Sequence, residues 1–179
     1  MEVNLFQNMK TILTFLLVLS LCAAVTAQDP SKAVTAKGYI STDKVNQGGS
    51  FAVAVVLDID PQFHINSAKP LDENLIPTKV EPLKVEGFTF SIPTYPKGET
   101  QKFAFSDEAL SVYGGRTVIR LKATAAKTVP LGLKTIKVKL GYQACNNQAC
   151  FAPKTVEIPI EVEVVKAGVK VSPANTQFF

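Results

Sequence analysis

The sequence of 179 residues has no tryptophan, one histidine (His64) and three cysteines. One histidine cannot supply a multi-histidine metal site, and three cysteines are too few for a dense disulfide scaffold. Arginine, the side chain that most often reads bases, occurs only at Arg116 and Arg120. A net charge of +4 is too small to indicate nucleic-acid binding, so we expect no nucleic-acid partner.

The N-terminal segment is typical of a secretory signal peptide. Lys10 precedes a leucine-rich apolar run over residues 11–25, and Val25-Thr26-Ala27 places small residues at positions −3 and −1 before Gln28. We therefore expect residues 1–27 to be a signal peptide that is removed after Ala27.

Removal of this segment also removes the first cysteine, Cys22, and leaves Cys145 and Cys150. A lipid anchor on Cys22 is an alternative, but Leu21 stands where a lipoprotein signal has a small residue. An uncleaved anchor is a second alternative, although the apolar run is shorter than the ~20 residues of a membrane span. We expect a periplasmic or secreted protein, in an oxidising compartment where thiols normally pair.

From about residue 33 onward, apolar and polar residues alternate with the period of two that is typical of β-strands. Proline- and glycine-containing turns separate the segments, which favours an all-β sandwich or barrel over residues 28–166. Residues 167–179 form a short tail without the apolar length of a membrane span, so no span is expected after signal removal. The predicted strands cover residues 33–41, 51–59, 78–85, 101–105, 117–124, 133–142 and 156–165.

Cys145 and Cys150 are separated by four residues that include Asn146-Asn147, which favour a tight turn. A four-residue loop between two strands places its flanking residues opposite each other, with Cα atoms about 4.5–5.5 Å apart. That separation allows a disulfide bond. The loop is so short that the bond would stabilise the fold by only about 2 kcal/mol. Because a domain of this size does not need it, the pair is either a redox element or a passive structural disulfide.

Metal binding is a further alternative, since two thiolates and His64 could hold zinc or copper. The spacing of Cys145 and Cys150 is wider than that of the usual zinc knuckle, so we expect no metal and no other cofactor. Thioredoxin-type chemistry needs a Cys-x-x-Cys motif on a helix, which this spacing excludes.

Several motifs resemble the N-terminal periplasmic domain of the thiol:disulfide interchange protein DsbD family. They are His64-Ile-Asn-Ser67, Leu75-Ile-Pro-Thr78, Leu140-Gly-Tyr-Gln-Ala-Cys145 and Cys150-Phe-Ala-Pro153. The resemblance covers roughly residues 33–165 and implies an immunoglobulin-like β-sandwich.

The resemblance also implies a function as a protein-disulfide reductase or another component of thiol–disulfide interchange. Cys145 and Cys150 would be the catalytic redox pair, with Cys150 forming the intermolecular bond to thioredoxin-fold periplasmic proteins. The family's full protein continues into a membrane electron carrier and a thioredoxin-like domain, whereas this sequence ends at Phe179. We therefore expect a separate membrane electron donor.

The resemblance further suggests which side chains surround the pair. A cap loop over residues 103–108 would cover the sulfurs with Phe103 or Phe105. Ordinary core packing is the alternative for both, and for at least one of them we expect it. His64 and Asn66 occupy the strand where the family has tyrosines beside the cysteines, and a histidine there could tune a thiolate or accept a proton. The alternative for His64 is a strand-edge residue with a satisfied hydrogen bond. Tyr142, from the motif before Cys145, is a further candidate.

A function from a different class is a non-catalytic, immunoglobulin-like binding or adaptor domain, in which the disulfide of the hairpin only holds a loop. Such a domain would still bind its partner after both Cys145 and Cys150 are replaced by alanine. A redox module would lose its activity.

Overall fold

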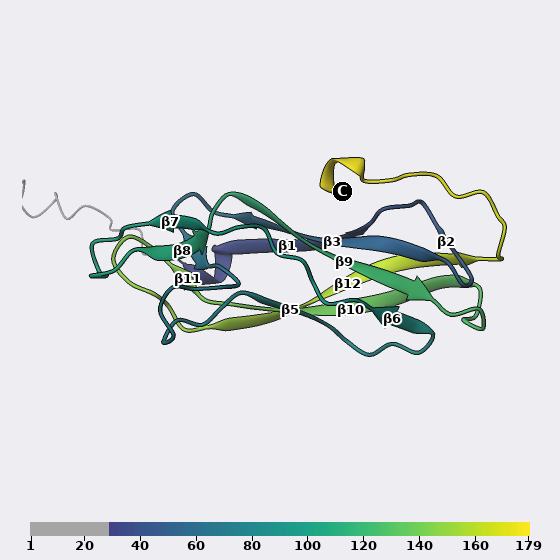
Figure 1. The fold of residues 1–179 in the computed structure, drawn as a ribbon, viewed down its shortest axis with the longest axis horizontal. Coiled ribbons are helices and arrows are strands. Elements are labelled where there is room, and N and C mark those ends of the chain that lie inside the picture. The colour runs from purple at the N-terminus through teal and green to yellow at the C-terminus, as the bar shows by residue number, and fades with distance from the viewer. Residues whose placement is uncertain (1–28) are drawn as a thin grey trace, which may run out of the picture.

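Two four-stranded β-sheets pack face to face in the computed structural model, which describes residues 29–179 (Figure 1). The predicted signal peptide lies outside the described residues. The first sheet has the order β1-β3-β9-β6 and the second the order β2-β12-β10-β5. All neighbours are antiparallel except β2 and β12. The strands are β1 (Val34–Ile40), β2 (Val45–Asn46), β3 (Ser50–Ile59), β5 (Lys79–Pro82), β6 (Phe88–Phe90), β9 (Arg116–Ala125), β10 (Gly132–Tyr142) and β12 (Lys154–Val165).

A third, smaller sheet lies at one end of this sandwich, with the order β11-β4-β8-β7 (Figure 1). Its strands are short: β4 (His64–Asn66), β7 (Glu99–Gln101), β8 (Leu110–Tyr113) and β11 (Ala144–Cys145). β11 follows β10 after one residue, so the small sheet continues the second large sheet beyond its end. Both cysteines of the hairpin lie at this end of the molecule.

The core consists of the inward-facing residues of the two large sheets. In β10, Ile136, Val138 and Leu140 are fully buried, while the intervening lysines point outward. The same alternation holds in β12, where Ile160 packs against β1. Gly38 of β1 permits this close approach, because a Cβ atom there would lie 2.3 Å from Cγ1 of Ile160. The alternating pattern and the layered sheets confirm the predicted all-β, immunoglobulin-like sandwich.

The long predicted strands are confirmed to within a few residues, but the strand predicted over residues 101–105 is wrong. The strand there is β7, which ends at Gln101, and residues 102–109 form a loop. Turn bonds replace ladder bonds in this loop: the Ser106 N–H donates to the carbonyl of Phe103, and the Lys102 ammonium donates to the carbonyl of Asp107. Phe103 is therefore a loop residue that packs inward.

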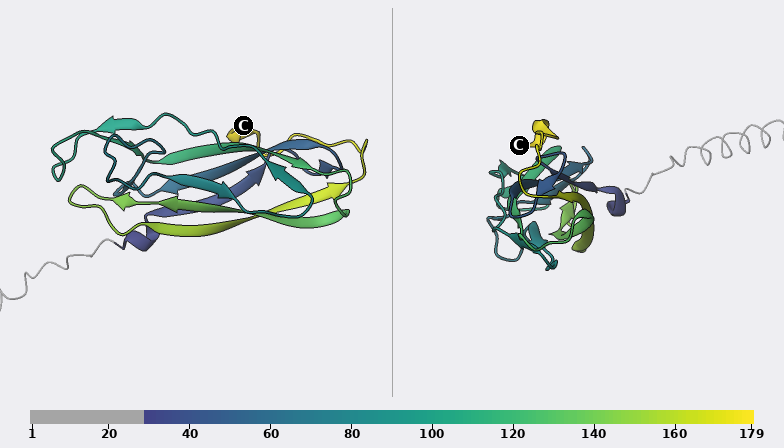
Figure 2. Two further views of the ribbon diagram at one scale, coloured as in Figure 1. Left: turned by 60° about the horizontal axis from the view of Figure 1, so that its bottom comes forward. Right: turned by 90° about the vertical axis from the view of Figure 1, so that its right-hand side faces the viewer.

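The C-terminal segment after β12 turns back and runs over the outer face of the first sheet (Figures 1 and 2). It ends in a short 3-10 helix, η2 (Thr176–Phe178), and a second such helix, η1 (Pro30–Lys32), precedes β1. Phe178 is buried against Ala54 and Val56. No helix among residues 29–179 has the length and apolar character that a membrane crossing requires.

Candidate functional site

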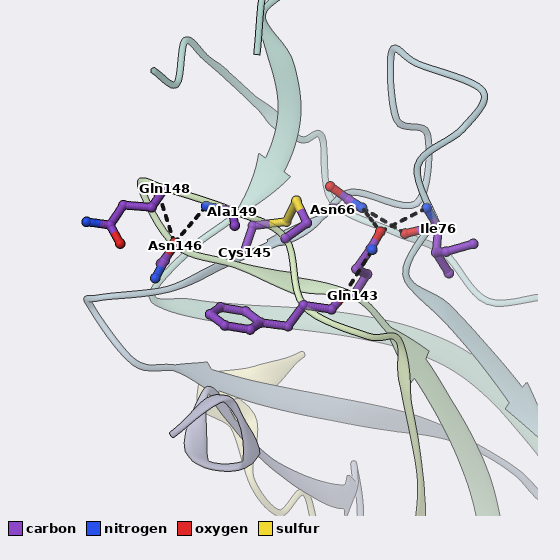
Figure 3. The surroundings of a disulfide bond; sticks show 9 residues. Asn66, Ile76, Gln143, Cys145, Asn146, Gln148 and Ala149 are labelled. Carbon is purple, nitrogen blue, oxygen red and sulfur yellow. Dashed lines mark hydrogen bonds between the residues drawn. A yellow bond between two sulfur atoms is a disulfide. The ribbon is translucent and has the colours of Figure 1, made fainter. Parts of the chain in front are cut away.

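Cys145 and Cys150 form a disulfide bond at the tip of the hairpin that joins β11 to β12 (Figure 3). Their Cα atoms are 3.9 Å apart, closer than the range expected for cross-strand neighbours in general. Backbone bonds flank the pair on both sides: Phe151 N–H donates to the Ala144 carbonyl, and Asn146 N–H donates to the Ala149 carbonyl. The cysteines thus occupy a non-hydrogen-bonded position, where opposing Cα atoms lie closest.

Asn146 closes the four-residue loop between the cysteines. Its side-chain oxygen accepts hydrogen bonds from the backbone N–H groups of Gln148 (2.8 Å) and Ala149 (2.9 Å) (Figure 3). An asparagine side chain that bonds the backbone two or three residues ahead stabilises a tight turn. The loop is therefore fixed by its own sequence as well as by the disulfide.

Cys145 is the middle residue of a row of three side chains across the small sheet. It pairs with Cys150 on one side and with His64 of β4 on the other. Directly opposed residues of antiparallel strands project from the same face of a sheet. The structure therefore brings His64 beside the disulfide.

His64 is buried, with 6% of its surface exposed, and its Nε2 has no hydrogen-bond partner within residues 29–179. Burial lowers the pKa of His64 to about 4, because the protonated imidazolium loses its hydration and no charged group compensates. At neutral pH the imidazole is uncharged. It can then either donate or accept one hydrogen bond through Nε2, depending on its tautomer.

An aromatic stack covers His64 on the outside. The ring of Phe103 lies on the imidazole with a centroid distance of 3.9 Å, and Phe105 stacks on Phe103 at 5.6 Å. Phe103 is buried together with Leu110 and Val112 of β8, in a cluster separate from the main core. The loop over residues 102–109 therefore covers His64, the neighbour of Cys145 in this row.

A family model matches the part of the chain that contains this disulfide. The family model, described as "Thiol:disulfide interchange protein DsbD, N-terminal", matches residues 34–161. The chain belongs to this family. It is thus a domain of the DsbD N-terminal type, and the matched residues include both cysteines, His64 and the loop over residues 102–109.

Among curated proteins, none matches the chain. Among solved structures, a similar one is the "Crystal structure of the N-terminal periplasmic domain of ScsB from Proteus mirabilis", with a TM-score of 0.46 and 9% sequence identity. The similarity covers 76% of this chain and 49% of that chain. The chain thus spans about half the length of that structure.

Asn66, two residues after His64, lies on the same face of β4 of this DsbD-type domain. Its side-chain amide donates to the Ile76 carbonyl (3.1 Å) and to Oε1 of Gln143 (3.0 Å) (Figure 3). Its own Oδ1 is buried and has no hydrogen-bond partner in the described part of the chain. Asn66 therefore belongs to the surroundings of the hairpin but contacts it through Gln143.

Tyr142, in contrast, faces the other way. It is 2% exposed and packs in the main core with Leu140 and Ile158. Burial raises the pKa of its hydroxyl. Since alternate residues of a strand face opposite sides, Tyr142 points away from the face that carries Cys145. The structure does not bring it together with His64 and Phe103.

Two residues at the site were not singled out from the sequence. Gln143 bonds to three other segments of the chain, and the backbone of Ile76 bonds to both Gln143 and Asn66. Gln143 lies inside the motif that carries the family resemblance, two residues before Cys145. Its position there was the available signal, but the partners of its amide depend on segments far away in the sequence.

The two cysteines differ in their exposure. Cys145 is completely buried, whereas Cys150 is partly exposed. A thiolate from outside reaches a disulfide only through an accessible sulfur, and it must approach along the line of the bond that breaks. Cys150 is thus the more accessible residue of the pair.

Proposed function

We propose that this domain is exported, that it exchanges disulfides with thioredoxin-fold proteins of the periplasm or the extracellular space, and that Cys150 forms the intermolecular bond. The observation that carries the proposal is the difference in exposure between buried Cys145 and partly exposed Cys150. The family match supports thiol–disulfide interchange. The signal-like segment over residues 1–27 supports export.

In the exchange, a thiolate of the partner attacks Sγ of Cys150. A mixed disulfide forms between the partner and Cys150, the Cys145–Cys150 bond breaks, and Cys145 leaves as a thiolate that takes up a proton. A second thiol of the partner then attacks the partner's own sulfur in the mixed disulfide and releases Cys150. The domain gains two electrons and two protons, and the partner becomes a disulfide. The reverse sequence passes the electrons onward, and the two reduction potentials set the direction.

The departing Cys145 thiolate would be buried, and a buried charge is costly unless it is protonated or hydrogen-bonded. His64 lies directly opposite Cys145, and its Nε2 has no partner among residues 29–179. In the tautomer that carries hydrogen on Nε2, His64 donates a hydrogen bond to this thiolate. Phe103 covers His64, and Phe105 stacks on Phe103, so that the two rings limit access of water to His64.

The electrons that reduce the domain come, in this proposal, from a membrane electron carrier. The domain is then an intermediate between that carrier and thioredoxin-fold proteins. Its catalysis needs no metal or organic cofactor, because the cysteine pair carries both electrons.

Two measurements test the proposal. The first is the reduction potential of the cysteine pair in glutathione buffers. The second is trapping with a thioredoxin-fold protein that lacks its resolving cysteine and carries its remaining cysteine as a mixed disulfide with thionitrobenzoate. The Cys145→Ser variant, whose Cys150 thiolate displaces thionitrobenzoate, should form the protein–protein disulfide faster than the Cys150→Ser variant. A reduction potential below about −300 mV together with no trapped complex would identify an inert structural bond and favour the adaptor function.

A further inference from the structure

We infer that Gln143 is the positioning residue of the redox hairpin: its side-chain amide keeps Cys150 opposite Cys145 when the disulfide is open. This inference rests on the proposed function, because it concerns the dithiol form that exchange produces. It starts from the register of the strands on either side of the hairpin.

The strands β10 and β12 pair in a register that ends at Tyr142↔Lys154. Continued by three residues, this register would place Phe151 opposite Cys145, but the observed partner of Cys145 is Cys150. Between these two pairs, residues 143–144 on one strand therefore face residues 151–153 on the other. One strand carries an extra residue, which is the definition of a β-bulge.

The bulge decides which side chain meets Cys145. Without the extra residue, Phe151 would lie beside Cys145, and Cys150 would point to the opposite face of the sheet. The shift in register is therefore what places the two cysteines opposite each other. The shift also interrupts the backbone ladder, and Pro153 in the bulge has no N–H to donate.

Gln143 supplies the hydrogen bond that the backbone lacks at this point. Its Nε2 donates to the Phe151 carbonyl at 3.0 Å, on the residue directly after Cys150 (Figure 3). Its Oε1 accepts from the backbone N–H of Ile76 (3.2 Å) and from Nδ2 of Asn66 (3.0 Å). Since an N–H can only donate and a carbonyl can only accept, these partners fix the orientation of the Gln143 amide.

The contribution of Gln143 differs between the two redox states. In the disulfide form, the covalent bond holds Cys145 and Cys150 together whatever the bulge does. In the dithiol form, the register near the bulge depends on hydrogen bonds, chiefly those of Phe151 to Ala144 and Gln143. Loss of the Gln143 bond should therefore favour the dithiol, because its two thiols meet less often in the geometry that closes the ring.

The test is the equilibrium of the protein with reduced and oxidised glutathione, in which two glutathione thiols reduce the disulfide and become one glutathione disulfide. Gln143→Met keeps the length of the side chain and removes all three hydrogen bonds. We expect it to lower the equilibrium constant for disulfide formation about fivefold, the effect of one net hydrogen bond. Gln148→Met, an exposed residue of the same hairpin, is the matched control and should leave the constant unchanged.

A second variant keeps the test decisive if Gln143→Met does not fold. Gln143→Glu retains the oxygen that accepts from Asn66 and Ile76, but at neutral pH it cannot donate to Phe151. It should show the same fall in the equilibrium constant.

A purely structural role of Gln143 would lower the melting temperature of the oxidised and reduced forms equally and leave this constant unchanged. If both Gln143 variants keep the wild-type constant within twofold, the inference is wrong and the proposed function stands. If the wild-type pair itself forms no mixed disulfide, the proposed function fails instead.

Discussion

The imidazole of His64 and the ring of Phe103 lie face to face, with an interplanar angle of 13° and a centroid distance of 3.9 Å. The two residues come from different elements, since His64 begins β4 and Phe103 lies in the loop between β7 and β8. Their contact attaches this loop to the strand that pairs with Cys145. The loop is therefore held over His64 by this aromatic contact, and Phe105 stacks on Phe103.

Replacement of Phe103 by alanine should open this cover. Phe103 is 8% exposed, and truncation of a buried phenylalanine lowers the free energy of unfolding by about 3 kcal/mol. The variant should also react faster with reduced glutathione, because the row that contains Cys145 becomes accessible. Urea unfolding and the rate of disulfide reduction at fixed glutathione concentration measure the two effects.

Phe105→Ala is the control for this experiment, because Phe105 is only partly buried and touches Phe103 rather than His64. Its effect on both quantities should be smaller. Equal reduction rates for the Phe103 variant and the wild type would show that the loop does not limit access to the disulfide.

The stability of the fold should depend on pH through His64. The pKa of His64 is about 4 in the folded protein against 6.5 for an ordinary histidine. Between these pH values the unfolded chain is protonated at His64, whereas the folded protein is not. Stability is therefore complete above pH 6.5 and decreases as the pH falls towards 4. The loss at pH 4–4.5 amounts to about 2–3 kcal/mol of unfolding free energy.

His64→Phe removes this titration and retains a ring for stacking on Phe103. Urea unfolding of both proteins between pH 7.5 and 4.5 measures the free energy of unfolding of each. On going from pH 7.5 to 4.5, the wild type should lose about 2–3 kcal/mol more than the variant. Asp29, Asp43 and Glu81, whose pKa values are lowered in the fold, are present in both proteins and cancel. A difference that does not change with pH would contradict burial of a neutral His64.

The long strands could be predicted because one of their faces is buried and the other is exposed. In β10, buried Ile136, Val138 and Leu140 alternate with lysines, and the sequence shows this period directly. The strands β4 and β8 have three and four residues, and all of them are buried. Alternation is absent from a strand that is covered on both faces, so periodicity could not define these two.

The local contact at the site was predictable from the sequence, and its long-range contacts were not. The spacing of Cys145 and Cys150 was sufficient to predict a disulfide, because the contact is local. The pairing of Cys145 with His64 joins residues 81 positions apart. The hydrogen bond from Gln143 to Phe151 depends on a one-residue shift in the register of the two strands. Both are consequences of how distant strands meet, which the sequence of either strand does not show.

Gly98 provides a test of the packing beside the site. A Cβ atom at this position would lie 2.3 Å from Oγ of Ser111 and 2.7 Å from Cβ of Ser67, two buried residues whose hydroxyls bond each other at 2.8 Å. Gly98→Ala should therefore lower the free energy of unfolding by about 1–3 kcal/mol, as overpacking does. Gly114→Ala is the control, because no atom of residues 29–179 lies within 4 Å of a Cβ placed there. Equal unfolding free energies for the two variants would show that Ser67 and Ser111 move apart without cost.

The C-terminal tail gives a last prediction, at a distance from the disulfide. Phe178 is 8% exposed, its ring lies 4.6 Å from that of Tyr39, and its carbonyl accepts a hydrogen bond from Nε of Arg120. Phe178→Ala should lower the free energy of unfolding by about 2 kcal/mol, less than a truncation in the main core because the chain end can adjust.

Phe179→Ala is the matched control, since Phe179 is 40% exposed, and its effect should stay within about 0.5 kcal/mol. Neither change should alter the equilibrium with glutathione, because Phe178 packs in a cluster separate from that of Phe103. Urea unfolding and the glutathione equilibrium, measured on the same preparations, distinguish a tail that stabilises the sheet from one that acts on the redox site. A changed glutathione equilibrium in the Phe178 variant would contradict this separation of the Phe178 cluster from the Phe103 cluster.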